Sequence, residues 1–247
     1  MASSAGSHAP SDERLANVGA IRRLFQRPEI GALLGAIAIF LLFSILVPDL
    51  FPTIFGVARI LDPASTIGIM AVSVALLLIG GEFNLSIGVL TGTCSLIIGL
   101  LTVEAGWGVW PAIFVSLLFA IVVGWINGWL VVRTGLPSFI ITLATMFVLR
   151  GANVGVTRLV TDHVNVAGID AGRGFELARL VFNTEITFLG VEFRTTIIWW
   201  IALTILGQWI LMRTKYGNWI FAAGGDKVSA RNVGVPVNRV KIVLFIQ

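Results

Sequence analysis

The longest apolar run in the sequence constrains the fold most, because nothing in it suits the surface of a soluble protein. Residues 107–132 are 26 consecutive amino acids without a charged side chain. A helix crosses the hydrocarbon core of a bilayer with about 20 residues. Of all 247 residues, 57% are hydrophobic and 12% are charged, which lies outside the range of soluble domains. The chain is therefore predicted to be an all-α, polytopic transmembrane helical bundle.

Other apolar runs predict the remaining membrane spans, and short polar segments separate them. Three runs contain two glycines spaced four residues apart, which lets a neighbouring helix approach closely. These pairs are Gly31/Gly35, Gly88/Gly92 and Gly124/Gly128. We expect a disordered cytosolic tail at residues 1–29 and a transmembrane domain at residues 30–247. The predicted spans are 30–47, 64–81, 85–103, 107–132, 138–157 and 195–212, with the start of a further span at 242–247.

Basic residues between the spans predict the orientation of the chain, because lysine and arginine concentrate on the cytoplasmic side. The segment 213–241 carries six basic residues and one acidic residue, Asp226, whereas the segment 158–194 is nearly balanced in charge. We therefore expect the N-terminus and residues 218–239 inside, and residues 158–194 outside. Alternation of apolar and polar residues about Leu189-Gly190 predicts a short β-hairpin at 184–193.

The segment 80–88 interrupts the apolar sequence: it contains glycines next to Glu82, Asn84 and Ser86. Glycine weakens a helix, and irregular backbone at membrane depth is tolerated where it lines a cavity. The segment therefore predicts a broken helix beside a polar pathway. An ordinary cytosolic turn is the alternative.

The segment 137–151 begins with Pro137 and ends with Arg150-Gly151. The helix between Pro137 and Arg150 would be about 18 Å long, shorter than a hydrocarbon core of about 30 Å. Either the helix continues with Arg150 buried, or it is a half-span. Thr142 and Thr145 share one face and either present hydroxyls inward or hydrogen-bond to a neighbouring helix. Asn127 is predicted to hydrogen-bond between helices.

The segment 218–239 contains the signals of a short helix outside the membrane. Asp226 is a suitable N-cap, Gly234 closes the helix in a left-handed conformation, and Pro236 prevents its continuation. The predicted helix of about two turns, 227–233, is too short to be stable alone. We therefore expect a partner surface to order it, with a solvated loop as the alternative.

Three motifs together give the chain a family resemblance. Gly224-Gly225-Asp226, Ser229-Ala230-Arg231 and Gly234-Val235 resemble the cytoplasmic coupling loop of ATP-driven importer permeases. Residues 80–88 resemble the Gly-Gly-Ile-Asp-Leu-Ser-x-Gly signature of ribose/xylose-type ABC sugar importers, and residues 137–151 resemble their Pro-Ser/Pro-Phe-Ile-x-Thr-Leu run closed by Arg-Gly. Two departures stand out: Glu82 replaces a usual glycine and Asn84 a usual aspartate, so a role that needs a carboxylate at position 84 is in doubt.

The resemblance implies a permease subunit of the branched-chain amino acid/monosaccharide permease family, in the bacterial inner membrane. Such a subunit translocates a monosaccharide handed over by a secreted or periplasmic solute-binding protein. The implied partners are an ABC ATPase subunit, that solute-binding protein, a second permease copy and the lipid bilayer, without nucleic acid. The implied substrate-pathway residues are Glu82, Asn84, Ser86, Thr142, Thr145 and Arg150, and the ATPase-coupling residues are Gly225, Asp226, Ala230, Arg231 and Gly234.

The sequence lacks the residues that several other functions require. No Gly-x-x-x-x-Gly-Lys-Ser/Thr loop is present, so ATP hydrolysis is expected in a separate subunit, and the chain itself is expected to be no enzyme and to hold no cofactor. His8 and His163 are isolated and Cys94 is the only cysteine, so no metal site is expected. A secondary transporter or channel, and an ABC permease for amino acids or nucleosides, remain alternatives. Residues 241–247 are too short to span a bilayer, so we expect the chain to be truncated.

Overall fold

The computed structural model describes residues 28–162 and 166–247, apart from residue 189. Most of the predicted cytosolic tail, His163 and the hairpin residue Leu189 lie outside these residues. Two units are described separately, residues 1–57 and residues 58–247. The elements are α2 (Pro28–Leu46), α3 (Ile54–Ile79), α4 (Ile87–Gly99) continued by a π-helical turn (Leu100–Glu104), α5 (Val109–Thr134), α6 (Ser138–Thr161), a 3₁₀ turn (Ile169–Ala171), α7 (Phe175–Phe182), β1 (Glu185–Phe188), β2 (Val191–Arg194), α8 (Thr196–Arg213), α9 (Lys215–Gly225), α10 (Lys227–Asn232) and α11 (Val237–Ile246).

The predicted all-α membrane bundle is confirmed by these helices. In the part of the chain that the structure describes, five are long and apolar enough to cross a membrane: α3, α4 with its π-helical turn, α5, α6 and α8. In the first unit, α2 is apolar but shorter, and Phe51 packs on Phe40 and Phe43 of this helix with ring centroids 5.4 and 5.3 Å apart. The chain is a multi-pass membrane protein.

Three predicted boundaries differ from the structure. Helix α3 begins at Ile54 rather than at residue 64, because it includes Arg59, Asp62 and Pro63, which the apolar pattern excludes. Helix α6 is continuous for 24 residues, which corresponds to about 36 Å, so it is a full span rather than a half-span. Helix α11 begins at Val237, before the predicted residue 242. The sequence reading also missed α9, a helix of 11 residues.

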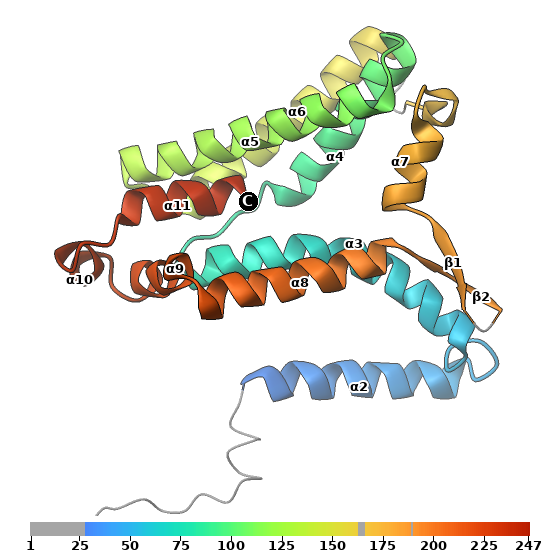
Figure 1. Cartoon of the computed structure of the whole chain (residues 1–247), viewed down its shortest axis with the longest axis horizontal. Coiled ribbons are helices and arrows are strands. Elements are labelled where there is room, and N and C mark those ends of the chain that lie inside the picture. The colour runs from blue at the N-terminus through green and yellow to red at the C-terminus, as the bar shows by residue number, and fades with distance from the viewer. Residues whose placement is uncertain (1–27, 163–165, 189) are drawn as a thin grey trace, which may run out of the picture. The chain divides into compact units, whose positions relative to one another are not determined.

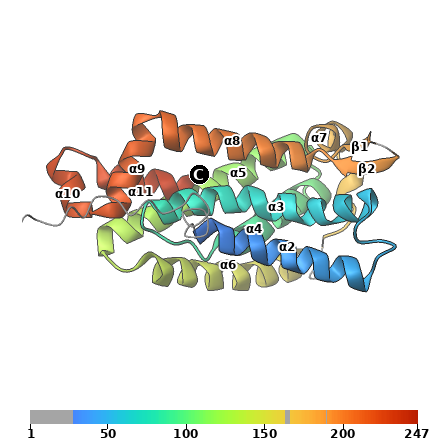
Figure 2. The same cartoon turned by 90° about the horizontal axis from the view of Figure 1, so that it is seen from below.

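Within residues 58–247, the loop elements gather at two opposite ends of the bundle (Figures 1 and 2). Helices α9 and α10 and the start of α11 lie at one end, and α7 and the hairpin lie at the other. The predicted hairpin is confirmed, with Glu185 opposite Arg194 and Phe188 opposite Val191. The indole N–H of Trp199 in α8 donates to the Val181 carbonyl at 2.9 Å, which attaches α7 to the end of a span.

Helix α11 packs against α5 through the predicted glycine pair. A Cβ atom on Gly124 would collide with the backbone of Phe245, and one on Gly128 would collide with the backbone of Ile242. The two helices therefore approach as closely as their backbones allow. Phe245 and Leu244 of α11 belong to the buried hydrophobic cluster at this end of the bundle. The other two glycine pairs, Gly31/Gly35 and Gly88/Gly92, face open space in the described residues.

The two ends of residues 58–247 differ in charge. The end with α9 to α11 carries mostly basic residues, as the loop sequence predicts, and we expect this end in the cytoplasm. Single cysteines at Asn183 and Ser229, both exposed, test this orientation in a chain whose Cys94 is replaced by serine. A membrane-impermeant maleimide added to intact cells should label only position 183. Labelling at position 229 in sealed cells would reverse the orientation.

Candidate functional site

The segment between α3 and α4 is an extended stretch of chain held by side chains of α6. The N–H groups of Gly80 to Glu82 still donate to carbonyls at the end of α3, and beyond them the backbone needs other partners inside the bundle. The N–H of Phe83 donates to the Ser138 hydroxyl at 2.9 Å, and the N–H of Leu85 donates to the Thr142 hydroxyl at 3.1 Å. Gly81 begins the stretch with φ 77°, a left-handed conformation that favours glycine.

This segment descends from the end of the bundle toward its interior (Figure 1). Phe83 contacts Ser138, the first residue of α6, and the last residue of the segment, Ser86, joins a network that reaches Thr145. Seven helical residues separate Ser138 from Thr145, which corresponds to a depth of about 10 Å. Helix α4 therefore begins about two turns inside the bundle. This geometry agrees with the predicted broken helix.

Four polar side chains form one hydrogen-bonded chain at the bottom of the segment. The Asn84 Oδ1 atom accepts from the N–H of Ser86 at 2.9 Å and from its hydroxyl at 2.7 Å. The Asn127 amide donates to the Ser86 hydroxyl at 3.3 Å, and the Thr145 hydroxyl donates to the Asn127 oxygen at 2.6 Å. The interhelical hydrogen bond predicted for Asn127 is present. Together these contacts fix α4, α5 and α6 to one another.

The structure brings together five of the six predicted pathway residues. Glu82, Ser86 and Thr142 are buried, and Asn84 and Thr145 are half-buried. The sixth, Arg150, does not join them: it lies near the middle of α6 and is exposed on this chain. Helix α6 continues past Arg150, as one of the two alternatives has it, and the Arg150 side chain is exposed on this chain rather than packed within it. The transport role of all six residues stays a prediction.

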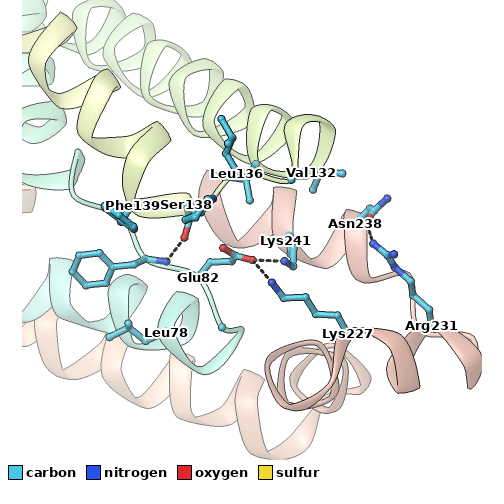
Figure 3. Close-up of a pocket in the computed structure, with 15 residues that line it drawn as sticks. Leu78, Glu82, Val132, Leu136, Ser138, Phe139, Lys227, Arg231, Asn238 and Lys241 are labelled. Atoms are coloured by element: carbon cyan, nitrogen blue, oxygen red, sulfur yellow. Dashed lines mark hydrogen bonds and ion pairs between the residues drawn. The ribbon is translucent and has the colours of Figure 1, made fainter.

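The Glu82 carboxylate lies at the top of the segment and binds two lysines (Figure 3). Its Oε1 atom accepts from the ammonium of Lys241 on α11 and, at 3.3 Å, from that of Lys227 on α10. Only 5% of the Glu82 side chain and 8% of the Lys241 side chain are exposed, against 51% for Lys227. Burial raises the pKa of Glu82, but hydrogen bonds from Lys241 and Ser138 and the charges of both lysines hold it below its usual 4.5. Glu82 is therefore ionised at neutral pH.

A cavity of about 640 Å³ opens beside this ion-pair cluster. Figure 3 shows Leu136, Val132 and Phe139 on one side of it and Lys227 and Arg231 on another. The Arg231 guanidinium donates to the Asn238 side chain at 2.8 Å. Three basic side chains against one carboxylate leave the cavity with excess positive charge.

The loop after α9 forms the short capped helix that the sequence predicts. The Asp226 carboxylate accepts from the N–H groups of Val228 and Ser229, both at 2.8 Å, and these bonds lower its pKa. Helix α10 runs from Lys227 to Asn232, one residue shorter than predicted, and Gly234 closes it with φ 86°. Gly225 and Arg231 are exposed on the same loop.

The surface role predicted for Ala230 needs correction. Ala230 is 3% exposed and belongs to the hydrophobic cluster of this chain, with Val237, Val240 and Leu244 of α11. A two-turn helix is ordered here by its own chain, so its inward face is occupied. The apolar residues that the loop exposes are instead Val228 (67% exposed) and Val233 (78% exposed).

The sequence reading missed Lys227 and Lys241 as members of the site. Both contribute to the basic character of segment 213–241, but charge counting does not show that they reach Glu82. The sequence does indicate that Glu82 has a basic partner, because a carboxylate beside a membrane span needs a cation. Which cation it finds depends on the fold, since the partners lie 145 and 159 residues away.

The substitution Asn84→Leu tests the predicted polar pathway. It removes the amide and the turn that Asn84 forms with Ser86. Loss of one hydrogen-bonding partner costs about 1–3 kcal/mol, so uptake should fall about 5- to 150-fold while assembly with the ATPase persists. Asn84→Asp, which keeps the acceptor oxygens of the turn, is the matched control and should retain assembly and uptake. Normal uptake by Asn84→Leu would reduce the segment to a structural connection.

The fold and this site define a class: a polytopic helical membrane protein with a polar broken segment between its spans and a capped loop helix at one end. The chain belongs to the family of permease components of branched-chain amino acid transport systems, whose sequence profile matches residues 56–247.

Three curated proteins illustrate the similarity. The xylose transport system permease protein XylH of Escherichia coli strain K12 is 26% identical over 260 residues, covering 85% of this chain and 65% of XylH. The autoinducer 2 import system permease protein LsrC of Salmonella typhi is 27% identical over 218 residues, covering 88% of this chain and 58% of LsrC. The autoinducer 2 import system permease protein LsrD of Klebsiella pneumoniae is 28% identical over 180 residues, covering 72% of this chain and 52% of LsrD. The chain thus spans between about half and two thirds of these relatives, and no solved structure matches it.

Proposed function

We propose that the chain is the membrane-spanning permease subunit of an ATP-driven importer for a monosaccharide or a similar small polyhydroxylated solute. A secreted solute-binding protein would deliver the solute, and a separate ATPase subunit would supply the energy. A second permease copy would complete the pathway. The chain itself would hold no cofactor and catalyse no reaction. Similarity to permeases named for xylose and for autoinducer 2 import supports this substrate class.

The loop helix α10 is the observation that carries the proposal. Helix α10 lies at the end of the bundle opposite the hairpin. Asp226 caps it and Ala230 is buried within the chain itself, whereas Val228 and Val233 on the same loop remain exposed. Exposed apolar residues on a loop outside the spans fit a partner surface better than water. A secondary transporter or channel needs no such helix.

Reconstitution with the cognate ATPase and solute-binding protein tests the proposal. In proteoliposomes, radiolabelled xylose should accumulate only when ATP, the ATPase and the binding protein are all present. Competition by other pentoses, hexoses, amino acids and nucleosides defines the solute class. Uptake without ATP would indicate a secondary transporter or channel. Accumulation of an amino acid or a nucleoside, but of no sugar, would show that the proposed substrate class is wrong.

A further inference from the structure

The Glu82 carboxylate is a point where four elements of the described chain meet: α10, the broken segment, α11 and the first residue of α6. It belongs to the connection between α3 and α4, Lys227 belongs to α10, Lys241 belongs to α11, and Ser138 begins α6. Figure 3 shows both ammonium groups directed at the same oxygen. A single side chain therefore contacts the element that would receive the ATPase and the elements that hold the polar segment.

The two lysines differ in what they do. Lys241 is buried, and its pairing with Glu82 anchors the carboxylate to α11. Lys227 is half exposed, is the first residue of α10, and reaches Glu82 from the loop. Lys227 is therefore the contact through which a displacement of α10 acts on Glu82 directly.

A second contact joins the broken segment to α9, the helix that directly precedes α10. A Cβ atom on Gly81 would lie 3.3 Å from Gly224 Cα, so the end of α9 rests on the start of the broken segment. The residue after Glu82 donates its N–H to Ser138, and Leu85 donates to Thr142. Movement of Glu82 is thus passed within one residue to the hydrogen bonds that hold the segment against α6.

We propose that Glu82 is a positioning residue that transmits movement of α10 to the broken segment through its ion pair with Lys227. This inference rests on the proposed function and names a connection inside the permease. Solute specificity does not depend on it. Breaking the pair should leave ATP hydrolysis running while fewer solute molecules move per ATP.

The test measures ATP hydrolysis and solute uptake in the same proteoliposomes, with the permease, ATPase and binding protein assembled. Glu82→Gln and Lys227→Met should each raise the ATP consumed per solute about tenfold, within the usual range of coupling between sites. Co-purification of the ATPase and its basal hydrolysis rate are measured alongside, so that a lost complex is distinguished from lost coupling. The double variant should be no worse than Glu82→Gln alone, because that substitution already removes the contact that Lys227→Met removes. Lys215→Met, which removes an exposed lysine at the start of α9, is the matched control and should keep the wild-type ratio.

The single variants also separate coupling from folding. Glu82→Gln leaves Lys241 buried without its carboxylate, and that variant alone is therefore exposed to misfolding. Lys227→Met keeps the Glu82–Lys241 pair, so a fully coupled Lys227→Met complex would overturn the inference even if Glu82→Gln fails to assemble. Multiplicative effects in the double variant would overturn it as well. If the wild-type complex shows no ATP-dependent uptake, the proposed function itself fails, before any variant is compared.

Discussion

Replacing Val228 and Val233 together by aspartate is expected to release the ATPase from the permease. Both side chains are exposed on the α10 loop, at 67% and 78%. Burying a valine contributes roughly 1.5–3 kcal/mol, so losing both contacts should weaken the complex at least about 100-fold. Co-purification from detergent and titration of ATPase into permease proteoliposomes measure this loss.

The control keeps the added charge and changes the position. Ser229→Asp puts a carboxylate on the same exposed helix without removing an apolar group, and it should retain most of the ATPase. Ala230→Trp is unsuitable as a probe of docking, because Ala230 is buried in the chain's own cluster and a larger side chain would disturb α11 first. Full ATPase retention by the double aspartate variant would move the docking surface away from this loop.

Leucine at Gly124 or Gly128 is expected to cost the folded chain much of its stability. A side chain at either position meets the backbone of α11, which has no rotamer to change. Overpacking of this kind costs about 1–3 kcal/mol per site, and more where the backbone must move. Thermal unfolding of the purified protein in detergent should show a lower midpoint for each variant.

Gly92→Leu provides the comparison, because Gly92 belongs to another predicted glycine pair but faces open space in the described residues. Its unfolding midpoint should stay near the wild-type value. Leucine favours a helix more than glycine does, so helix propensity cannot account for a loss at either site. Equal destabilisation at Gly92 and Gly124 would mean that added bulk in a span, rather than contact with α11, accounts for the loss.

Hydropathy predicts the spans well because the bilayer requires every one of them to be a long, apolar helix. The same rule fails at the start of α3, where Arg59, Asp62 and Pro63 belong to the helix although they break the apolar pattern. It also fails for α9, which is too short and too rich in glycine to register as a span. Capping chemistry is local, and for that reason Asp226 and Gly234 are read correctly from sequence.

The site itself is only partly readable from sequence. Five polar residues stand out because their neighbours in the sequence are apolar: Glu82, Asn84, Ser86, Thr142 and Thr145. Four of the five form hydrogen bonds or ion pairs with partners 18 to 159 residues away. Those pairings depend on which helix faces lie together. Ala230 shows the converse: its small size suggests a tight contact, but the sequence does not say whether the neighbour is a partner protein or the chain itself.

The long separations in this network also set an order of events during synthesis. Phe83 needs Ser138, which is made 55 residues later, and Glu82 meets Lys227 and Lys241 only after 145 and 159 further residues. At roughly 5–20 residues per second, Lys227 follows Glu82 by about 7–30 s. Until then both lysine partners of the carboxylate are missing, and of the partners described above Ser138 alone has been made. The broken segment therefore reaches its final geometry only after the loop proposed to engage the ATPase has been synthesised.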